Sequence, residues 1–336
     1  MNGIPSPLQY AICGQWTENA IRGSFKMNTK AIMRLSLTSL AVVLTALCTV
    51  SCHNSGNVEA VEASHIILIG LDGMSSADFV TDDMPTVSSL MNEGCRTFKK
   101  RSVLPSSSAI NWASMFMGVG TELHGYTTFG SETPELPSRV VNSHGICPTV
   151  FSLLDEQKPG CETGCIYEWN TIRCFIDTLA VRYHEKAGYT EECRDSLCIL
   201  AENYIRTKKP TIFAIIWDRP DHEGHAYGWG SEEYHAAVRE LDGYIARVIQ
   251  AAKDAGIYDD TVFIVTSDHG GLDKNHGNPT LNEVETPFII AGKGIRKGCE
   301  IGESMMQYDV AATIAEILGL ERPQVWVGRP VMSVFE

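Results

Sequence analysis

The sequence predicts an α/β fold in three layers: a central, mostly parallel β-sheet with helices packed on both of its faces. Three apolar runs rich in branched residues, at 65–69, 211–217 and 261–266, are hydrophobic throughout and do not alternate with polar residues. Such runs are typical of strands that are covered on both faces. Amphipathic stretches lie between the runs, and this alternation of strand and helix favours a parallel sheet.

The longest amphipathic stretch spans residues 231–255, where apolar side chains recur every three or four positions. A fourth apolar run follows at 286–291, and a second amphipathic helix is expected at 308–318, ended by Gly319. Residues 120–210 interrupt this regular pattern, and we interpret them as a cysteine-rich insertion packed over the edge of the sheet. Residues 64–336 are therefore expected to form one domain that contains this insertion.

The first 63 residues do not fit this domain. Residues 1–26 show no periodicity and indicate a mis-called start, whereas 27–52 combine a short basic stretch, an apolar segment and then Cys52. This pattern resembles a bacterial lipoprotein signal with Cys52 as the lipidated residue; ordinary signal-peptidase cleavage nearby is the alternative. Residues 53–63 are then a flexible tether. We expect an exported protein of the periplasm or cell envelope, held to a membrane only through this lipid anchor.

The charge balance excludes some partners. The chain has 336 residues, with 27 basic and 41 acidic side chains and a formal net charge of -14, so it lacks the broad positive field that non-specific binding of a nucleic-acid duplex requires. An acidic protein that handles phosphates needs local positive charge, most simply from a bound metal. No apolar run after residue 50 is long enough to span a bilayer, which excludes a multi-pass membrane protein.

Cysteine usage agrees with export. Three of the 11 cysteines lie in the leader, and six of the remaining eight fall between residues 147 and 198. An even, clustered set in an exported chain predicts disulfides, with their pairing left open. A structural zinc site is the less favoured alternative, because the mature chain has no CxxC pair.

Acids and histidines follow each of the three apolar runs, where the predicted strands end. In chain order they are Asp72, Asp221 and His225, and Asp268 and His269. Ligands in an open α/β sheet bind outside the carboxyl ends of its strands, so we expect these clusters to meet in one crevice. Each cluster alone is also typical of a turn. Together they match the mixed Asp and His ligands that zinc accepts, and His276 supplies one more imidazole.

A candidate nucleophile lies between the first two clusters. Residues 105–108 form a serine-rich loop that enters an apolar helix, with Ser108 at or near its start. The backbone N–H groups and the dipole at such a helix start favour an anion. Plain N-capping is the structural alternative. The two roles are compatible, because a metal at this place can lower the pKa of the hydroxyl.

These segments, in this order, resemble the alkaline phosphatase superfamily, and most closely its type I phosphodiesterase/nucleotide pyrophosphatase branch. The resemblance rests on GLDG at 70–73, SAIN at 108–111, PDHEGH at 220–225, SDHG at 267–270 and HG at 276–277. It implies an alkaline-phosphatase-like fold from about residue 65 to the end of the chain. It also implies metal-dependent hydrolysis of a small phosphate ester such as a nucleotide.

Carried over position by position, the resemblance implies two zinc ions. One ion is held by Asp221, His225 and His276, with His222 as the alternative to His225. The other is held by four residues: Asp72, Ser108, Asp268 and His269. The resemblance further implies that Ser108 attacks phosphorus to form a phosphoserine while the two metals stabilise the attacking and leaving oxygens. It assigns Asn111 to a non-bridging phosphate oxygen and gives His124 no ligand role.

Several functions remain open. The branch commonly has Thr where Ser108 stands, whereas alkaline phosphatases use Ser, so a phosphomonoesterase is the alternative to a phosphodiesterase. Arg173 is then the candidate to hold a dianionic monoester. Stacking of a base or sugar is weighed against core packing for three aromatic residues: Tyr126, Trp169 and Trp229. A sulfatase is disfavoured because the chain lacks a Cys-x-Pro-x-Arg sequence. The non-enzyme alternative is a lipid-anchored binding protein that has lost activity, yet every expected ligand position is filled.

Overall fold

An eight-stranded β-sheet forms the centre of the computed structural model, which describes residues 63–188, 190 and 193–336. The strand order across the sheet is β4-β3-β5-β1-β6-β7-β2-β8. The four strands that the apolar runs predict are β1 His65–Leu71, β5 Ile212–Trp217, β6 Thr261–Thr266 and β7 Glu285–Gly292. The other four are β2 Gly94–Arg101, β3 Thr163–Tyr167, β4 Tyr183–Lys186 and β8 Cys299–Glu300.

The sheet is mostly parallel, as predicted. β1 lies between β5 and β6 and is parallel to both, with Leu71 opposite Trp217 and Gly70 opposite Thr266. These three strands therefore end side by side. β7 is the antiparallel member and pairs with both β6 and β2.

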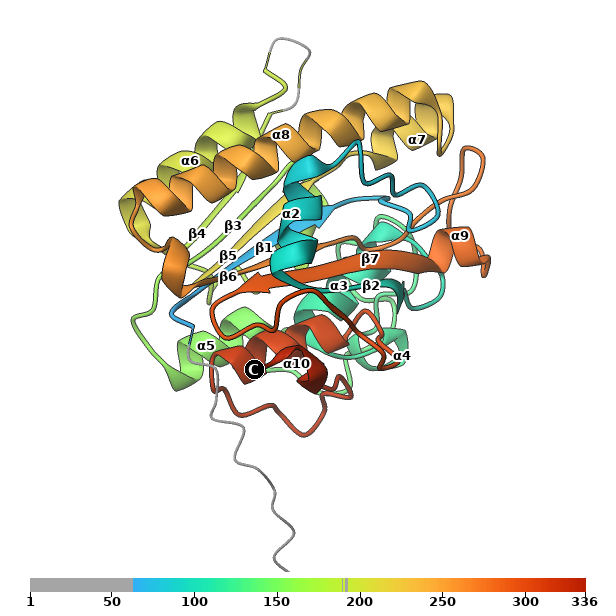
Figure 1. Ribbon diagram of the computed structural model, residues 1–336. Coiled ribbons are helices and arrows are strands. Elements are labelled where there is room, and N and C mark those ends of the chain that lie inside the picture. Colours follow the sequence, from blue (N-terminus) through green and yellow to red (C-terminus); the bar gives the residue numbers. More distant parts are fainter. Residues whose placement is uncertain (1–62, 189, 191–192) are drawn as a thin grey trace, which may run out of the picture. The chain divides into compact units, whose positions relative to one another are not determined.

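Helices cover both faces of the sheet (Figure 1), which confirms the three-layer fold. One face carries α2 Pro85–Glu93, α6 Ser196–Lys208 and α8 Glu232–Asp254. The other carries α3 Ser108–Met117, α5 Val150–Gln157 and α10 Asp309–Ile317. Short helices follow loops near the strand ends: α4 Thr121–His124, η1 Asn170–Cys174, α7 Asp221–Tyr227, η2 Tyr258–Asp260, α9 Leu281–Val284 and η3 Met332–Val334.

Both amphipathic helices were predicted from periodicity. Val238, Leu241 and Ile245 of α8 are fully buried, and with the rest of that face they pack into the apolar layer on one side of the sheet. On the opposite side, α10 is apolar around most of its surface and lies against α3. Within the described part of the chain, no helix is long and apolar enough to cross a membrane.

The expectation for residues 120–210 needs correction in one respect. We expected this segment to pack over the sheet edge, but it extends the sheet itself. β3 pairs in parallel with β5, and β4 pairs with β3, so the segment adds two strands and the helices α5 and α6 to the α/β arrangement. The four- and five-residue strands are too short to stand out by hydrophobicity among the polar loops that flank them.

The cysteine prediction was wrong for most of its members. The one disulfide among the described residues joins Cys95 to Cys299, across the strand pair β2 and β8 and outside the predicted cluster. The six cysteines between 147 and 198 are unpaired. Cys165 and Cys198 show why clustering in sequence is a weak guide, because they are buried on opposite faces of the sheet. The predicted leader and tether, residues 1–26, 27–52 and most of 53–63, lie outside the described residues.

Candidate active site

Three carboxylates meet where β1, β5 and β6 end, as the strand-end pattern predicts. Asp72 follows β1, Asp268 follows β6, and Asp221 opens α7 just after β5. Two hydrogen bonds join the segments that follow these strands: the Asp221 amide donates to the Asp72 carbonyl over 3.0 Å, and the Gly73 amide donates to Asp268 Oδ1 over 3.1 Å. Asp72 and Asp268 are buried.

Histidines complete two overlapping groups of ligand atoms. Asp72, Asp268 and His269 form one group, in which all ligand atoms lie within 4.8 Å of one another. Asp221, His269 and His276 form the other by the same measure. His225 lies beside the second group, with its Nε2 3.4 Å from Asp221 Oδ2. The structure thus brings all six predicted Asp and His ligands to one place.

All three ligand histidines are oriented in the same way. The Nδ1 atoms of His225, His269 and His276 lie 2.9, 2.8 and 3.0 Å from the backbone carbonyls of Lys274, Gly270 and Ser106. Because a carbonyl can only accept, each Nδ1 carries a proton, and Nε2 is the ring nitrogen that remains to face a metal. Metal-ligating histidines characteristically have such a carbonyl partner. Burial lowers the pKa of both His269 and His276 to about 3, which keeps them neutral.

The electron-rich atoms of the site fit a metal cation. His269 Nε2 lies 3.3 Å from Asp268 Oδ2 and 3.4 Å from Asp72 Oδ1, so a lone pair faces two carboxylates. Asp268 Oδ2 and Asp221 Oδ1 are buried and accept no hydrogen bond from the described residues. Unpaired buried acceptors are costly, and a divalent cation would satisfy them together. Nitrogen and carboxylate oxygen ligands are a donor set that suits zinc.

Crowding of carboxyl groups shifts their pKa values. Burial, followed by repulsion from Asp268 and Asp221, raises the pKa of Asp72 well above its usual range. Burial likewise raises the pKa of Asp221, and it raises that of Asp268 to about 6. A further carboxyl that the sequence reasoning did not assign, Asp218 at the end of β5, has its pKa raised to about 7 by burial and by Glu168. Each of these shifts would be reversed by a nearby cation.

Ser108 lies at this cluster. It is the first residue of α3 and is buried, and its Oγ is 3.0 Å from His269 Nε2 and 3.5 Å from Asp72 Oδ1. The N-cap residue is Ser107, so plain capping does not account for the Ser108 hydroxyl. Because α3 starts here, the N–H groups of its first turn lack intrahelical acceptors and can bind an anion.

The Asn111 side chain is bound by the loop that carries Ser108, and its expected role toward a non-bridging phosphate oxygen stays a prediction. Its side chain is fully buried: Oδ1 accepts from the Val103 amide over 2.8 Å, and Nδ2 donates to the carbonyls of Val103, Pro105 and Ser107. An amide whose donors and acceptor all bind the loop backbone holds that loop in place. Asn111 therefore positions the loop that carries Ser108.

A second buried hydrogen bond lies at the end of the site that holds Ser108. Trp112 of α3 donates from its indole Nε1 to Asp72 Oδ2 over 2.9 Å.

His124, which the resemblance left without a ligand role, is fully buried and forms a hydrogen bond with the Ser114 hydroxyl through Nε2. It accepts the Tyr126 amide at Nδ1, so it stabilises the turn after α4.

The three aromatic candidates differ in burial: Tyr126 is buried, whereas Trp169 and Trp229 are partly buried. Tyr126 packs against Phe175 and donates to the Cys174 carbonyl. The Trp229 indole donates to the Gly73 carbonyl, and its ring centroid lies 5.3 Å from that of His225 and 6.2 Å from that of His276. Trp169 differs, because its ring stacks on that of Phe129, with centroids 6.1 Å apart and planes at 11°.

Phe129 was missed in the sequence. It is 65% exposed, and its ring centre lies 6.0 Å from that of His276, so an aromatic shelf formed by Phe129 and Trp169 adjoins a metal ligand. No sequence pattern marks a single phenylalanine in a polar loop.

Arg173, expected beside a dianionic substrate, pairs instead with Glu132 over 2.7 Å at the surface.

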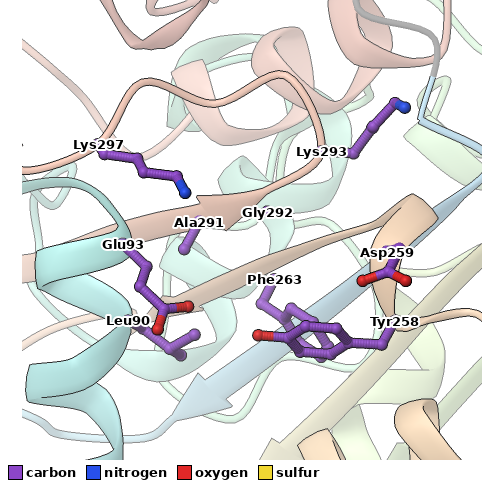
Figure 2. A pocket seen from close by; sticks show the side chains of 9 residues that line it. All are labelled: Leu90, Glu93, Tyr258, Asp259, Phe263, Ala291, Gly292, Lys293 and Lys297. Atoms are coloured by element: carbon purple, nitrogen blue, oxygen red, sulfur yellow. The ribbon is translucent and has the colours of Figure 1, made fainter.

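A hollow of about 200 Å³ lies away from this site, toward the amino end of β6. Figure 2 shows Glu93 and Tyr258 on one side of it and Lys297 on the other. None of its lining residues belongs to the metal-ligand cluster or to the loop that carries Ser108. It is therefore not the candidate active site.

Comparison with known proteins identifies the family. Residues 66–286, more than half of the chain, match the type I phosphodiesterase / nucleotide pyrophosphatase family. The chain belongs to this family, within the alkaline phosphatase superfamily.

Individual relatives are distant. The chain is 21% identical over 222 residues to the bis(5'-adenosyl)-triphosphatase enpp4 of Mus musculus, an alignment of 64% of this chain and 49% of that protein. It is 32% identical over 103 residues to the extracellular sulfatase SULF-1 homolog of Drosophila melanogaster, an alignment of 29% of this chain and 9% of that protein. The chain thus spans about half the length, or less, of these curated relatives.

Solved structures show the same fold. Human ectonucleotide pyrophosphatase / phosphodiesterase 5 superposes with a TM-score of 0.66 at 14% identity, covering 81% of this chain and all of that one. A putative sulfatase from Bacteroides thetaiotaomicron also superposes with a TM-score of 0.66 at 14% identity, covering 81% of this chain and 75% of that one. These two structures superpose on the chain equally well, so the fold alone does not distinguish a nucleotide pyrophosphatase from a sulfatase, whereas the family match does.

Proposed function

We propose that the protein is a zinc-dependent phosphodiesterase of small, nucleotide-like phosphate esters. The observation that carries this proposal is the position of Ser108: a buried hydroxyl at a helix start, in contact with His269 and Asp72 of the ligand cluster. A serine, an anion-binding helix start and metal ligands meeting in one place are the parts that phosphoryl transfer requires.

The chain's own residues define the steps. Ser108 Oγ, after release of its proton to solvent, attacks phosphorus, and the bond to the leaving oxygen breaks as the bond to Oγ forms; the leaving oxygen takes a proton from water, and the resulting phosphoserine still carries the other ester group of the diester. Backbone N–H groups at the start of α3 bind the equatorial phosphate oxygens. Water then cleaves the phosphoserine and regenerates Ser108. Two bound zinc ions would stabilise the attacking and leaving oxygens.

Charge favours a diester over a monoester. A diester substrate carries one negative charge on its phosphate, whereas a monoester dianion gains more from a basic side chain. Arg173 is engaged with Glu132, and the contacts of Ser108 among the described residues are with Asp72 and His269. A phosphomonoesterase is the second candidate, favoured by the identity of residue 108 as Ser, the residue that alkaline phosphatases use.

The aromatic shelf supports a nucleotide-like substrate. Phe129 and Trp169 present stacked rings next to His276. When the phosphate of a substrate is bound at Ser108, a base attached through its ester group can reach these rings. Stacking of a base on such rings contributes about 1–3 kcal/mol. An inactive variant of the murine phosphodiesterase 5, similar in fold to this chain, has been solved in complex with AMP.

Hydrolysis rates test this proposal. Purified, zinc-loaded protein is assayed on bis-p-nitrophenyl phosphate, thymidine 5'-monophosphate p-nitrophenyl ester and p-nitrophenyl phosphate. We expect preference for the two diesters; preference for the monoester would select the second candidate. Ser108→Ala should be inactive but folded, while Ser107→Ala, the neighbouring control, should retain activity. If Ser108→Ala is as active as wild type, Ser108 is not the nucleophile. If every preparation is inactive, the non-enzyme alternative stands.

We also propose export and lipidation at Cys52. The basic and apolar stretches before Cys52 support this proposal. Membrane fractionation of cells producing wild type and Cys52→Ala tests it, because loss of the acylated cysteine should move the protein out of the membrane fraction. An equal distribution of the two proteins would favour ordinary signal-peptidase cleavage.

A further inference from the structure

Lys100 is a fully buried lysine in β2 that the steps above do not use. Its Nζ donates to the Ser267 carbonyl over 2.8 Å and also contacts the side-chain oxygen of Gln307. Ser267 immediately precedes the ligands Asp268 and His269. The lysine thus reaches the turn that carries two ligand residues, although β7 separates β2 from β6 in the sheet.

This contact belongs to a set of bonds on the same turn. Ser102, two residues beyond Lys100, donates to the next carbonyl, that of Asp268, over 2.8 Å. Gln307 Nε2 adds a second donor to the Ser267 carbonyl at 3.3 Å. The two consecutive carbonyls are therefore both held from the β2 side, by side chains that are themselves buried.

The choice of a lysine here is informative. A buried ammonium costs several kcal/mol to desolvate, and its direct partners are a neutral carbonyl and a neutral amide. An apolar residue of similar length would avoid that cost. The bond to Ser267 can be donated by either the ammonium or the neutral amine, so the contact does not depend on the ionisation state of the lysine.

We propose that Lys100, together with Gln307, is a positioning residue for the metal centre: it fixes the Ser267 carbonyl so that Asp268 and His269 present their ligand atoms in register. It touches neither substrate nor the reacting atoms. The inference rests on the metal site of the proposed function, but not on its substrate. Changing an outer partner of a metal ligand typically weakens metal binding about 10–100-fold.

Zinc affinity measured by competition with a chromophoric chelator tests the proposal. Lys100→Met keeps the apolar length of the side chain and removes its donor. We expect it to bind one of two zinc ions about 10–100-fold more weakly than wild type. Lys99→Met is the matched control, because Lys99 is the exposed neighbour on the same strand. Near-ultraviolet circular dichroism checks that both variants are folded.

The outcomes separate the two proposals. If Lys100→Met is folded, or merely less stable, and binds both zinc ions with wild-type affinity, Lys100 is only structural and the inference is overturned. If Lys100→Met fails to fold, Gln307→Met decides: weaker zinc binding supports the inference, and wild-type affinity overturns it. If the wild-type protein binds no zinc, both the proposed function and this inference fail.

Discussion

Replacement of Asp268 by Asn should stabilise the metal-free protein at neutral pH. Burial raises the pKa of this carboxyl from 3.8 to about 6. The unfolded chain therefore ionises Asp268 near pH 4, while the folded chain holds the proton to about pH 6. The carboxyl's contribution to stability is present below pH 4 and is lost as the pH rises to 6.

The size of the effect follows from that shift. At about 1.4 kcal/mol for each pH unit, the ionised Asp268 destabilises the folded metal-free protein by about 3 kcal/mol above pH 6. In Asp268→Asn, Oδ1 still accepts from the Gly73 amide, and the new Nδ2 replaces an oxygen that lies 3.3 Å from His269 Nε2, the atom that Ser108 Oγ also contacts. The amide therefore removes a charge and adds a donor.

Urea unfolding in a chelating buffer at pH 4 and pH 8 measures this. We expect Asp268→Asn to be about 3 kcal/mol more stable than wild type at pH 8, with a smaller difference at pH 4. With saturating zinc the order should reverse, because the variant loses a ligand. Asp259→Asn, an exposed control, should behave like wild type. An Asp268→Asn protein less stable than wild type in chelator at pH 8 would refute the reasoning.

Four further results are expected. Trp112→Phe removes the donor to Asp72 Oδ2, so zinc affinity by chelator competition should fall about 10–100-fold. Zinc binding should release protons near pH 6, because the pKa of Asp268 is raised to about 6 and zinc would displace the proton that this carboxyl holds; calorimetry in buffers of different ionisation enthalpy detects this. Phe129→Ala should raise KM for the thymidine ester by about 5–100-fold relative to p-nitrophenyl phosphate. Cys299→Ser opens a loop of 204 residues and should cost about 2–5 kcal/mol in urea unfolding.

The sequence was most informative where burial and chemistry act on the same short segment. β1, β5 and β6 are apolar throughout because both of their faces are covered, so each strand and the acid that follows it could be read together. Since parallel neighbours end at one edge of the sheet, Asp72, Asp221 and Asp268 could be placed in one site before any distance was known. β2 gave no such signal, because it carries four basic residues among its eight and alternates between buried and partly exposed positions.

The residues that hold or flank the site depend on contacts that chain order does not encode. Asn111 stands three residues after Ser108, and its amide binds the loop backbone, which spacing alone cannot reveal. In the sequence, Lys100 belongs to a basic stretch that is typical of a surface. Its contact with the turn after β6 becomes evident only once the sheet order places β2 two strands from β6. Phe129 becomes a candidate substrate contact only because its ring lies near that of His276 in the structure. Ligand residues are set by local strand ends, whereas the residues that hold or flank them are set by tertiary packing, and those require the structure.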